Sequence, residues 1–168
     1  YCTMAKRKTI AVPQNTRAML ERVVAKLKPP PAMTLSQWAD KERRLSQGAS
    51  ALPGRWRTDK APYQRGMMDA ISDPHVRKVV VKSCAQIGKT DALILNTIGY
   101  YMQYNPSPIM VLQPTLDMGQ GFSKEKLTPM LRDTPCLRGM VDNRSRMSGN
   151  TILLKNFPGG YLVIVGAN

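Results

Sequence analysis

A Gly-Lys-Thr triplet at residues 88–90 offers the clearest chemistry in the sequence, and it closes the run Ser83-Cys84-Ala85-Gln86-Ile87-Gly88-Lys89-Thr90. A phosphate-binding loop needs Gly, four residues and then Gly-Lys-Ser/Thr, because its backbone N–H groups must wrap a phosphate. Here Ser83 replaces the first glycine. Gly88 would admit the phosphate, Lys89 would neutralise its oxygens and the Thr90 hydroxyl would coordinate magnesium. The run therefore predicts a site for ATP and Mg²⁺.

Four residues, two inside this loop and two before it, have more than one possible role. Cys84 is better explained as a small semi-buried apolar residue than as a redox centre. Gln86 would orient a water or a γ-phosphate oxygen, or else face solvent. The pair Tyr63-Gln64 precedes the loop by enough chain to fold back over it. There the ring and the amide would stack on adenine and hydrogen-bond to it, although the residue types alone favour Tyr63 as a packing residue.

The segments around the loop predict how it is held. Three consecutive valines predict a buried strand over Val79–Lys82, and an apolar face of helical period predicts a helix over Asp91–Gln103. A second short strand is expected at Ile109–Leu112 and a crossover helix at Asp117–Leu131. Two strands joined by such a helix form a right-handed βαβ unit.

Two more strands are expected near the C-terminal end of the sequence, at Thr151–Leu154 and Tyr161–Val165, separated by a Pro-Gly-Gly turn. Together the elements predict an α/β fold of the P-loop NTPase type. Its sheet should be mainly parallel, with Val79–Lys82 and Ile109–Leu112 as inner strands and helices on both faces.

The sequence divides into residues 1–33 and 34–168, and the second part contains the loop. The first part is expected to be a helix over Thr16–Lys28 followed by a stiff proline run. The second part should open with a helix at Thr34, where Thr34-x-x-Gln37 has the form of a capping box. Another helix is expected over Tyr63–Ile71.

The charge of the chain points to a polyanionic partner, because 25 Lys and Arg face 11 Asp and Glu, a formal net charge of +14. Nucleic acid is the leading partner and an anionic membrane surface the second. The sequence has no run of roughly 20 apolar residues and no signal-peptide pattern, so a cytosolic protein is expected. Three widely spaced cysteines favour neither a disulfide framework nor a zinc site.

A basic segment interleaved with tryptophan could hold a phosphate backbone and stack against bases. Its candidate contacts to nucleic acid are Arg43, Arg44, Arg55 and Arg57, beside Trp38 and Trp56. A solvated helix face and loop explain the same pattern about equally well.

The sequence shows no acidic pair at the end of an apolar strand, which a nucleotide hydrolase uses to hold magnesium and activate water. We therefore expect this chain to bind nucleotide and to hydrolyse it poorly.

Across Thr34–Asn168, the order and spacing of several motifs resemble the large terminase subunits of tailed bacteriophages, specifically the lambda-like GpA type. The matching stretches are Ser36-Gln37-Trp38-Ala39, Trp56-Arg57-Thr58, Ala61-Pro62-Tyr63-Gln64, Ala85-Gln86-x-Gly88-Lys89-Thr90, Gln113-Pro114-Thr115, Phe122-Ser123-x-Glu125, Pro129-Met130-Leu131, Phe157-Pro158-Gly159-Gly160 and Gly166-Ala167-Asn168. As a set they are far more specific than the phosphate loop alone.

The resemblance implies the first part of the ATPase domain of a motor that drives double-stranded DNA into a procapsid. In this family the complete subunit also carries a C-terminal nuclease. By that likeness Tyr63 and Gln64 contact adenine, Lys89 and Thr90 take phosphate and magnesium, and Gln113-Pro114-Thr115 couples nucleotide state to DNA grip. The implied partners are double-stranded DNA, the small terminase subunit, the portal and procapsid, and further copies of the chain, in the cytoplasm of a bacterial host.

The chain departs from the family pattern at the loop and beyond it. Many terminases carry an arginine in the loop, where this chain has Ala85 and Gln86. Some relatives carry a lysine at the start of the loop, and Lys82 lies there as a second possible phosphate contact. The strand ending in Asp-Glu would lie beyond Asn168, so the chain resembles a fragment. A helicase-like P-loop ATPase fragment and a non-catalytic, DNA-binding prophage remnant are the alternatives.

Overall fold

The computed structural model describes residues 16, 19, 33–48, 53–141 and 149–167 of the 168-residue chain. The chain divides into two units, Tyr1–Ala32 and Met33–Asn168. The helix predicted over Thr16–Lys28 and the proline run after it lie almost wholly outside the described residues; of them, Thr16 and Met19 are described, both helical in backbone and exposed. All other described residues belong to the second unit.

The first helix of this unit, α2 (Leu35–Glu42), begins at the capping box that the sequence predicts. The Gln37 N–H donates to Thr34 Oγ1 at 3.4 Å, and the Thr34 N–H donates to Gln37 Oε1 at 3.1 Å. One face of α2 is buried. After it, β1 (Arg44–Leu45) pairs antiparallel with β2 (Gly54–Arg55).

Two 3₁₀ turns, Thr58–Lys60 and Pro62–Gln64, lead into helix α3 (Arg65–Ser72). The predicted helix over Tyr63–Ile71 is thus confirmed in place, with its start two residues later. Helix α2 packs against both α3 and α4 (Asn96–Gln103). None of the helices in the described ranges is long and apolar enough to cross a membrane.

The strand predicted at Val79–Lys82 is wrong. Residues 76–84 have no regular secondary structure, and Val80 is 77% exposed. A strand requires a neighbour that satisfies its backbone N–H and C=O groups. Neither sheet of the described residues includes this segment. The valines indicate β-propensity, but propensity supplies no pairing partner.

The helix predicted over Asp91–Gln103 is confirmed, with an unexpected first part. Residues Thr90–Leu95 form a π-helix, which continues directly into the α-helix α4 (Asn96–Gln103). Leu95, Ile98 and Met102 are fully buried along it. A π-helical turn is rare in proteins and is often found at functional sites.

The larger sheet contains a parallel and an antiparallel pair. Strand β3 (Ile109–Gln113) runs parallel to β5 (Gly160–Gly166), and β4 (Leu154–Phe157) pairs antiparallel with β5. The strand predicted at Ile109–Leu112 is confirmed, but it lies at an edge of the described sheet, so its prediction as an inner strand is wrong. The C-terminal strand pair is present, but its first strand lies later than predicted: β4 shares only Leu154 with Thr151–Leu154 and includes Phe157, which was expected in the turn. The connection from β3 to β5 contains α5 (Leu116–Phe122), a π-helical segment Ser123–Leu127 and α6 (Thr128–Asp133). A helix between two parallel strands is a βαβ arrangement.

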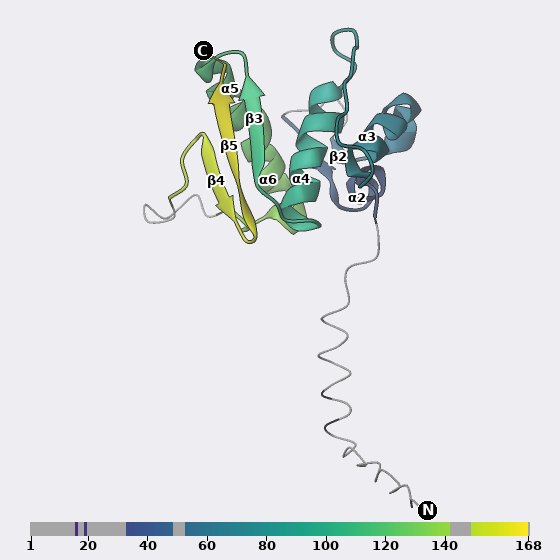
Figure 1. The fold of residues 1–168 in the computed structure, drawn as a ribbon, viewed down its shortest axis with the longest axis horizontal. Coiled ribbons are helices and arrows are strands. Elements are labelled where there is room, and N and C mark those ends of the chain that lie inside the picture. Colours follow the sequence, from purple (N-terminus) through teal and green to yellow (C-terminus); the bar gives the residue numbers. More distant parts are fainter. Residues whose placement is uncertain (1–15, 17–18, 20–32, 49–52, 142–148, 168) are drawn as a thin grey trace, which may run out of the picture. The chain divides into compact units, whose positions relative to one another are not determined.

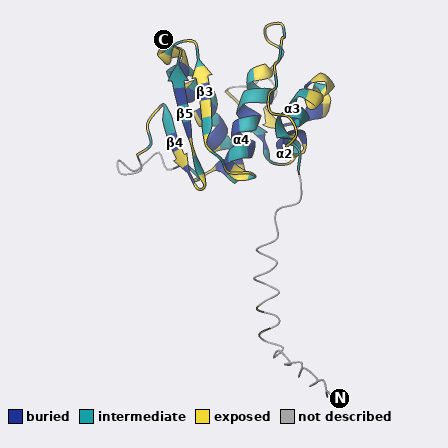
Figure 2. Cartoon of the chain, in the orientation of Figure 1, coloured by how far each residue is buried: buried dark blue, intermediate teal, exposed yellow. Residues whose placement is uncertain are grey.

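Helices cover one face of this sheet. Figure 1 shows α5 and α6 behind the sheet near β3 and β5, and α5 contacts both of these strands. Val111, Leu162 and Ile164 of the two strands are buried. On the opposite face Met110 and Leu112 are 70% and 64% exposed (Figure 2). Among the described residues, the expected cover of both faces is therefore present on one face only. The fold class is α/β as predicted, with a small mixed sheet.

Candidate nucleotide-binding site

The loop Ser83–Thr90 joins the irregular segment after α3 to the π-helix. Gly88 has a φ of +78° and Gln86 a φ of +58°, so two of its residues adopt left-handed backbone. Glycine tolerates this conformation because it lacks a Cβ. Most of the loop is exposed, and the half-buried residues are Ser83, Ile87 and Thr90. This placement presents the loop backbone and the Lys89 side chain to solvent. Cys84 is exposed, so its prediction as a semi-buried residue is wrong.

Tyr63 and Gln64 contact this loop at a single carbonyl group. The Tyr63 hydroxyl donates to the Ile87 carbonyl oxygen at 3.1 Å, and Gln64 Nε2 donates to the same oxygen at 2.7 Å. A Cβ on Gly88 would lie 3.1 Å from Gln64 Nε2, so glycine at this position leaves room for the amide. The structure thus brings together the two segments that the sequence assigned to one site.

The two side chains differ in exposure. Gln64 is 4% exposed, and its Oε1 is buried with no hydrogen-bond partner in the described part of the chain. Leaving a buried acceptor unsatisfied costs about 1–3 kcal/mol, so such an atom suggests a missing donor. Tyr63 is 59% exposed, so its ring can stack on a ligand. The prediction from residue type that Tyr63 is a packing residue is therefore wrong. An adenine base offers both a flat face and an exocyclic amine donor.

Lys89 and Thr90 lie where the helix begins. Lys89 is the N-cap residue, with an exposed side chain, and Thr90 is the first π-helical residue. The first N–H groups of a helix lack partners within the helix and carry a partial positive charge. A negatively charged phosphate placed between this end and the Lys89 ammonium would meet favourable charge from both.

Arg43 is not a nucleic-acid contact in this structure, because it is 2% exposed. Its Nε donates to Asn96 Oδ1 at 3.2 Å, its Nη2 donates to Asp91 Oδ1 at 3.3 Å, and its Nη1 donates to the carbonyl oxygen of Arg44. Burial lowers the guanidinium pKa to about 10, while Asp91 and then Asp133 oppose the shift. No sequence pattern revealed this network, because its members lie far apart in the chain.

The other basic candidates are accessible, but the tryptophans are not. Arg55 and Arg57 are exposed, and Arg44 is half-buried. Trp38 and Trp56 belong to the core, and their indole N–H groups donate to Gln103 at 2.8 Å and to Thr58 at 3.1 Å. The prediction that these two rings stack on bases is therefore wrong. Contacts from the three arginines to phosphate stay a prediction.

Asp91, which directly follows Thr90, is the acidic residue nearest to the loop in sequence. Its carboxylate forms an ion pair with Arg43. Within the described ranges, no group of three or more His, Cys, Asp or Glu side chains could hold a metal ion. Thr115, in the segment predicted to couple nucleotide to DNA, caps α5 by accepting from the Met118 N–H at 3.2 Å. Its observed contact is structural.

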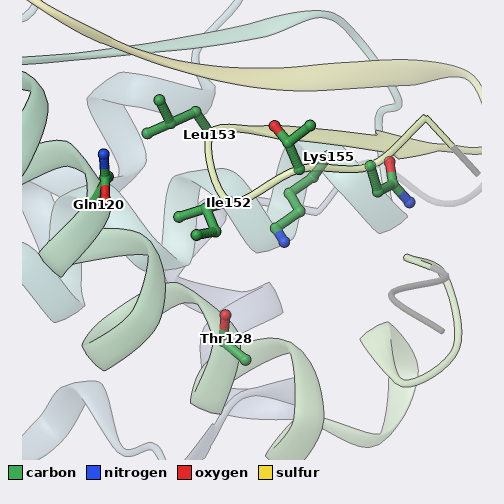
Figure 3. Close-up of a pocket in the computed structure, with 7 residues that line it drawn as sticks. Gln120, Thr128, Ile152, Leu153 and Lys155 are labelled. Carbon is green, nitrogen blue, oxygen red and sulfur yellow. The ribbon is translucent and has the colours of Figure 1, made fainter. Parts of the chain in front are cut away.

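A cavity of about 680 Å³ lies elsewhere, between β4 and the helices that cover the sheet (Figure 3). Lys155 of β4 points into it toward Thr128, and Gln120 of α5 forms another wall. Burial lowers the pKa of the Lys155 ammonium. The cavity contains no residue of Ser83–Thr90, so it is separate from the nucleotide site.

Comparison with known proteins matches residues 50–168 to the family model of the phage terminase large subunit gpA, ATPase domain. The large terminase subunit of Enterobacteria phage P21 is 30% identical over 132 residues, and that of Escherichia phage lambda is 27% identical over the same length. Each alignment covers 78% of this chain and 20% of the relative, so the chain spans about a fifth of their length. No solved structure matches the chain significantly.

Proposed function

The chain belongs to the gpA-type ATPase-domain family of phage terminase large subunits, and from that premise we propose that it binds ATP with magnesium at Ser83–Thr90. The observation that carries the proposal is the convergence of Tyr63 and Gln64 on the carbonyl oxygen of Ile87. A loop of phosphate-binding type is thereby linked to an exposed ring and to a buried amide with an unpaired oxygen.

Each group has a role that its chemistry supports. The Tyr63 ring stacks on adenine, and Gln64 Oε1 accepts a hydrogen bond from its exocyclic amine. Lys89 and the N–H groups of the loop residues hold the phosphates, since both supply positive charge. Cys84, Ala85 and Gln86 contribute through their backbone.

The Thr90 hydroxyl is the group that would hold magnesium together with the nucleotide. When bound, the ion neutralises the charge that develops on the phosphate oxygens. Asp91 is held by Arg43, and the described residues contain no acidic cluster beside Thr90. We therefore expect this chain to bind MgATP and to hydrolyse it poorly, because the described residues offer no acidic cluster beside Thr90 that could activate water.

At the level of the whole protein, the proposed role is DNA packaging, with ATP hydrolysis driving double-stranded DNA into a procapsid and a nuclease cutting it. Arg44, Arg55 and Arg57 are the proposed contacts to the DNA backbone. The small terminase subunit, the portal and further copies of the chain are the proposed partners, in the host cytoplasm.

A thermal-unfolding scan with and without MgATP tests the nucleotide site. The unmodified chain should be stabilised by about 2.7 kcal/mol at a hundredfold excess over its dissociation constant. Lys89→Ala should lose this shift, whereas Lys124→Ala, which removes an exposed lysine from the Ser123–Leu127 segment, should keep it. A cooperative transition with no MgATP shift in the unmodified chain would overturn the proposal.

The passive DNA-binding remnant makes a different prediction for the same variants. It would bind DNA in a salt-sensitive manner, with no response to Lys89→Ala and none to nucleotide. A helicase-like ATPase would instead bind MgATP and unwind a duplex, which a strand-displacement assay measures.

A further inference from the structure

A buried guanidinium links the start of the second unit to the helix that follows the phosphate loop. The Arg43 side chain extends from the C-cap of α2 and reaches both Asp91 and Asn96. The Arg43 side chain is buried, at 3% exposed, and that of its partner Asp91 is 28% exposed. A buried arginine is stable only where its donors meet acceptors, so these contacts fix its position.

The spacing of the two acceptors requires the π-helix. Asp91 and Asn96 are five residues apart, and the backbone N–H of Asn96 donates to the carbonyl oxygen of Asp91, which is the π-helical pattern. In an α-helix of about 3.6 residues per turn, side chains five apart point to different sides. The wider turn brings them to one side, where a single guanidinium bonds to both.

We propose that Arg43 is a positioning residue that holds Thr90–Leu95 in the π-helical register and so sets the orientation of Lys89 and Thr90 toward the nucleotide phosphates; this rests on the proposed nucleotide site. Helix α4 is anchored by Ile98 and Met102 in the core. Relaxation of the π-helix to α would turn the residues before it relative to α4 by roughly 100°, the angle spanned by one residue. Lys89 and Thr90 would then no longer face the loop's phosphate position.

The test begins without nucleotide. In Arg43→Lys the charge is kept, but the ammonium lacks the planar fork that reaches two acceptors. Residue-resolved amide exchange by NMR should show at least tenfold faster exchange at Asn96 and altered Cα shifts over Thr90–Leu95, with the β5 amides unchanged. Arg132→Lys, which alters an Arg–Asp pair whose arginine is 71% exposed, is the control and should leave Thr90–Leu95 unaffected. Unchanged exchange and shifts in Arg43→Lys would overturn the proposal.

The second arm measures affinity for MgATP and for AMP at a temperature where every variant is folded. The proposal predicts at least a tenfold loss for MgATP and less than a twofold change for AMP. The adenine contacts lie on another element, at Tyr63 and Gln64, and are not turned with the helix. Equal loss for both ligands, or for neither, would overturn it. If the unmodified chain binds no nucleotide, the proposed function fails, while the exchange experiment still decides whether Arg43 sets the helix register.

Discussion

Replacing Gly88 with alanine perturbs the nucleotide site at a position where backbone conformation and side-chain space are both restricted. The φ of +78° is left-handed, and an added Cβ would lie 3.1 Å from Gln64 Nε2. The left-handed conformation costs a residue with a Cβ about 1–2 kcal/mol. Displacement of the amide from the Ile87 carbonyl oxygen would forfeit a hydrogen bond worth about 1 kcal/mol.

At the lower end of these two terms, the expected cost of Gly88→Ala is about 2 kcal/mol. Because most of the loop is exposed, the free loop can relax, and the cost should appear when nucleotide binding restores its conformation. The corresponding loss of affinity is about 30-fold. At a MgATP concentration about 100 times the original dissociation constant, stabilisation should fall from about 2.7 to about 0.9 kcal/mol. In a domain of this size the thermal shift should fall from about 5–10 °C to about 2–4 °C.

Differential scanning fluorimetry with two glycine controls measures this effect. Gly139 has a φ of +82°, and an added Cβ there would meet nothing within 4 Å. Gly139→Ala therefore places the same left-handed backbone strain on a residue outside the loop. Gly66→Ala in α3 has neither restriction and should leave both stability and the MgATP shift intact or improve stability. A full MgATP shift in Gly88→Ala would refute the proposed link between loop backbone, Gln64 and nucleotide.

Two further predictions concern titratable groups. Hydrogen bonds from Arg132 and then Ser46 lower the pKa of Asp133 from 3.8 to about 2, so the carboxylate adds stability above pH 4 that is lost as the pH falls through 2. In Asp133→Asn, urea unfolding should show a smaller loss of stability between pH 4 and 2 than in the unmodified chain. Burial, with Glu42 nearby, raises the pKa of Cys136 to about 11, whereas Cys84 is exposed in the loop. Mass spectrometry after brief iodoacetamide treatment at pH 8 should find Cys84 modified well before Cys136, and MgATP should slow only Cys84; equal rates would contradict this reasoning.

Local signals predicted the elements whose causes lie within a few residues. The Thr34–Gln37 capping box, the helix after the loop and the strand Ile109–Leu112 all follow from short-range patterns, and the structure confirms them. Contact between Tyr63-Gln64 and the loop was expected as one possibility, and the Ile87 carbonyl oxygen is where it occurs.

What the sequence did not reveal depends on partners that are distant in the chain. Val79–Lys82 has the composition of a strand, but pairing requires a neighbour that no local pattern specifies. Arg43 has the type of a surface residue, yet acceptors 48 and 53 residues away satisfy its guanidinium in the core. Trp38 likewise depends on a distant acceptor, Gln103 Oε1, for the buried indole N–H.

The register of the sheet sets an order for folding. β4 and β5 meet across a short turn, with Phe157 opposite Gly160, so their pairing closes almost no loop. Pairing of β3 with β5 requires the closure of a long loop, because Ile109 pairs with Leu162, 53 residues later. The entropy of closing that loop is lost before the contacts form, which slows parallel pairing. We expect the hairpin to form early and β3 to dock last, so destabilising substitutions in β3 should mainly speed unfolding in stopped-flow experiments.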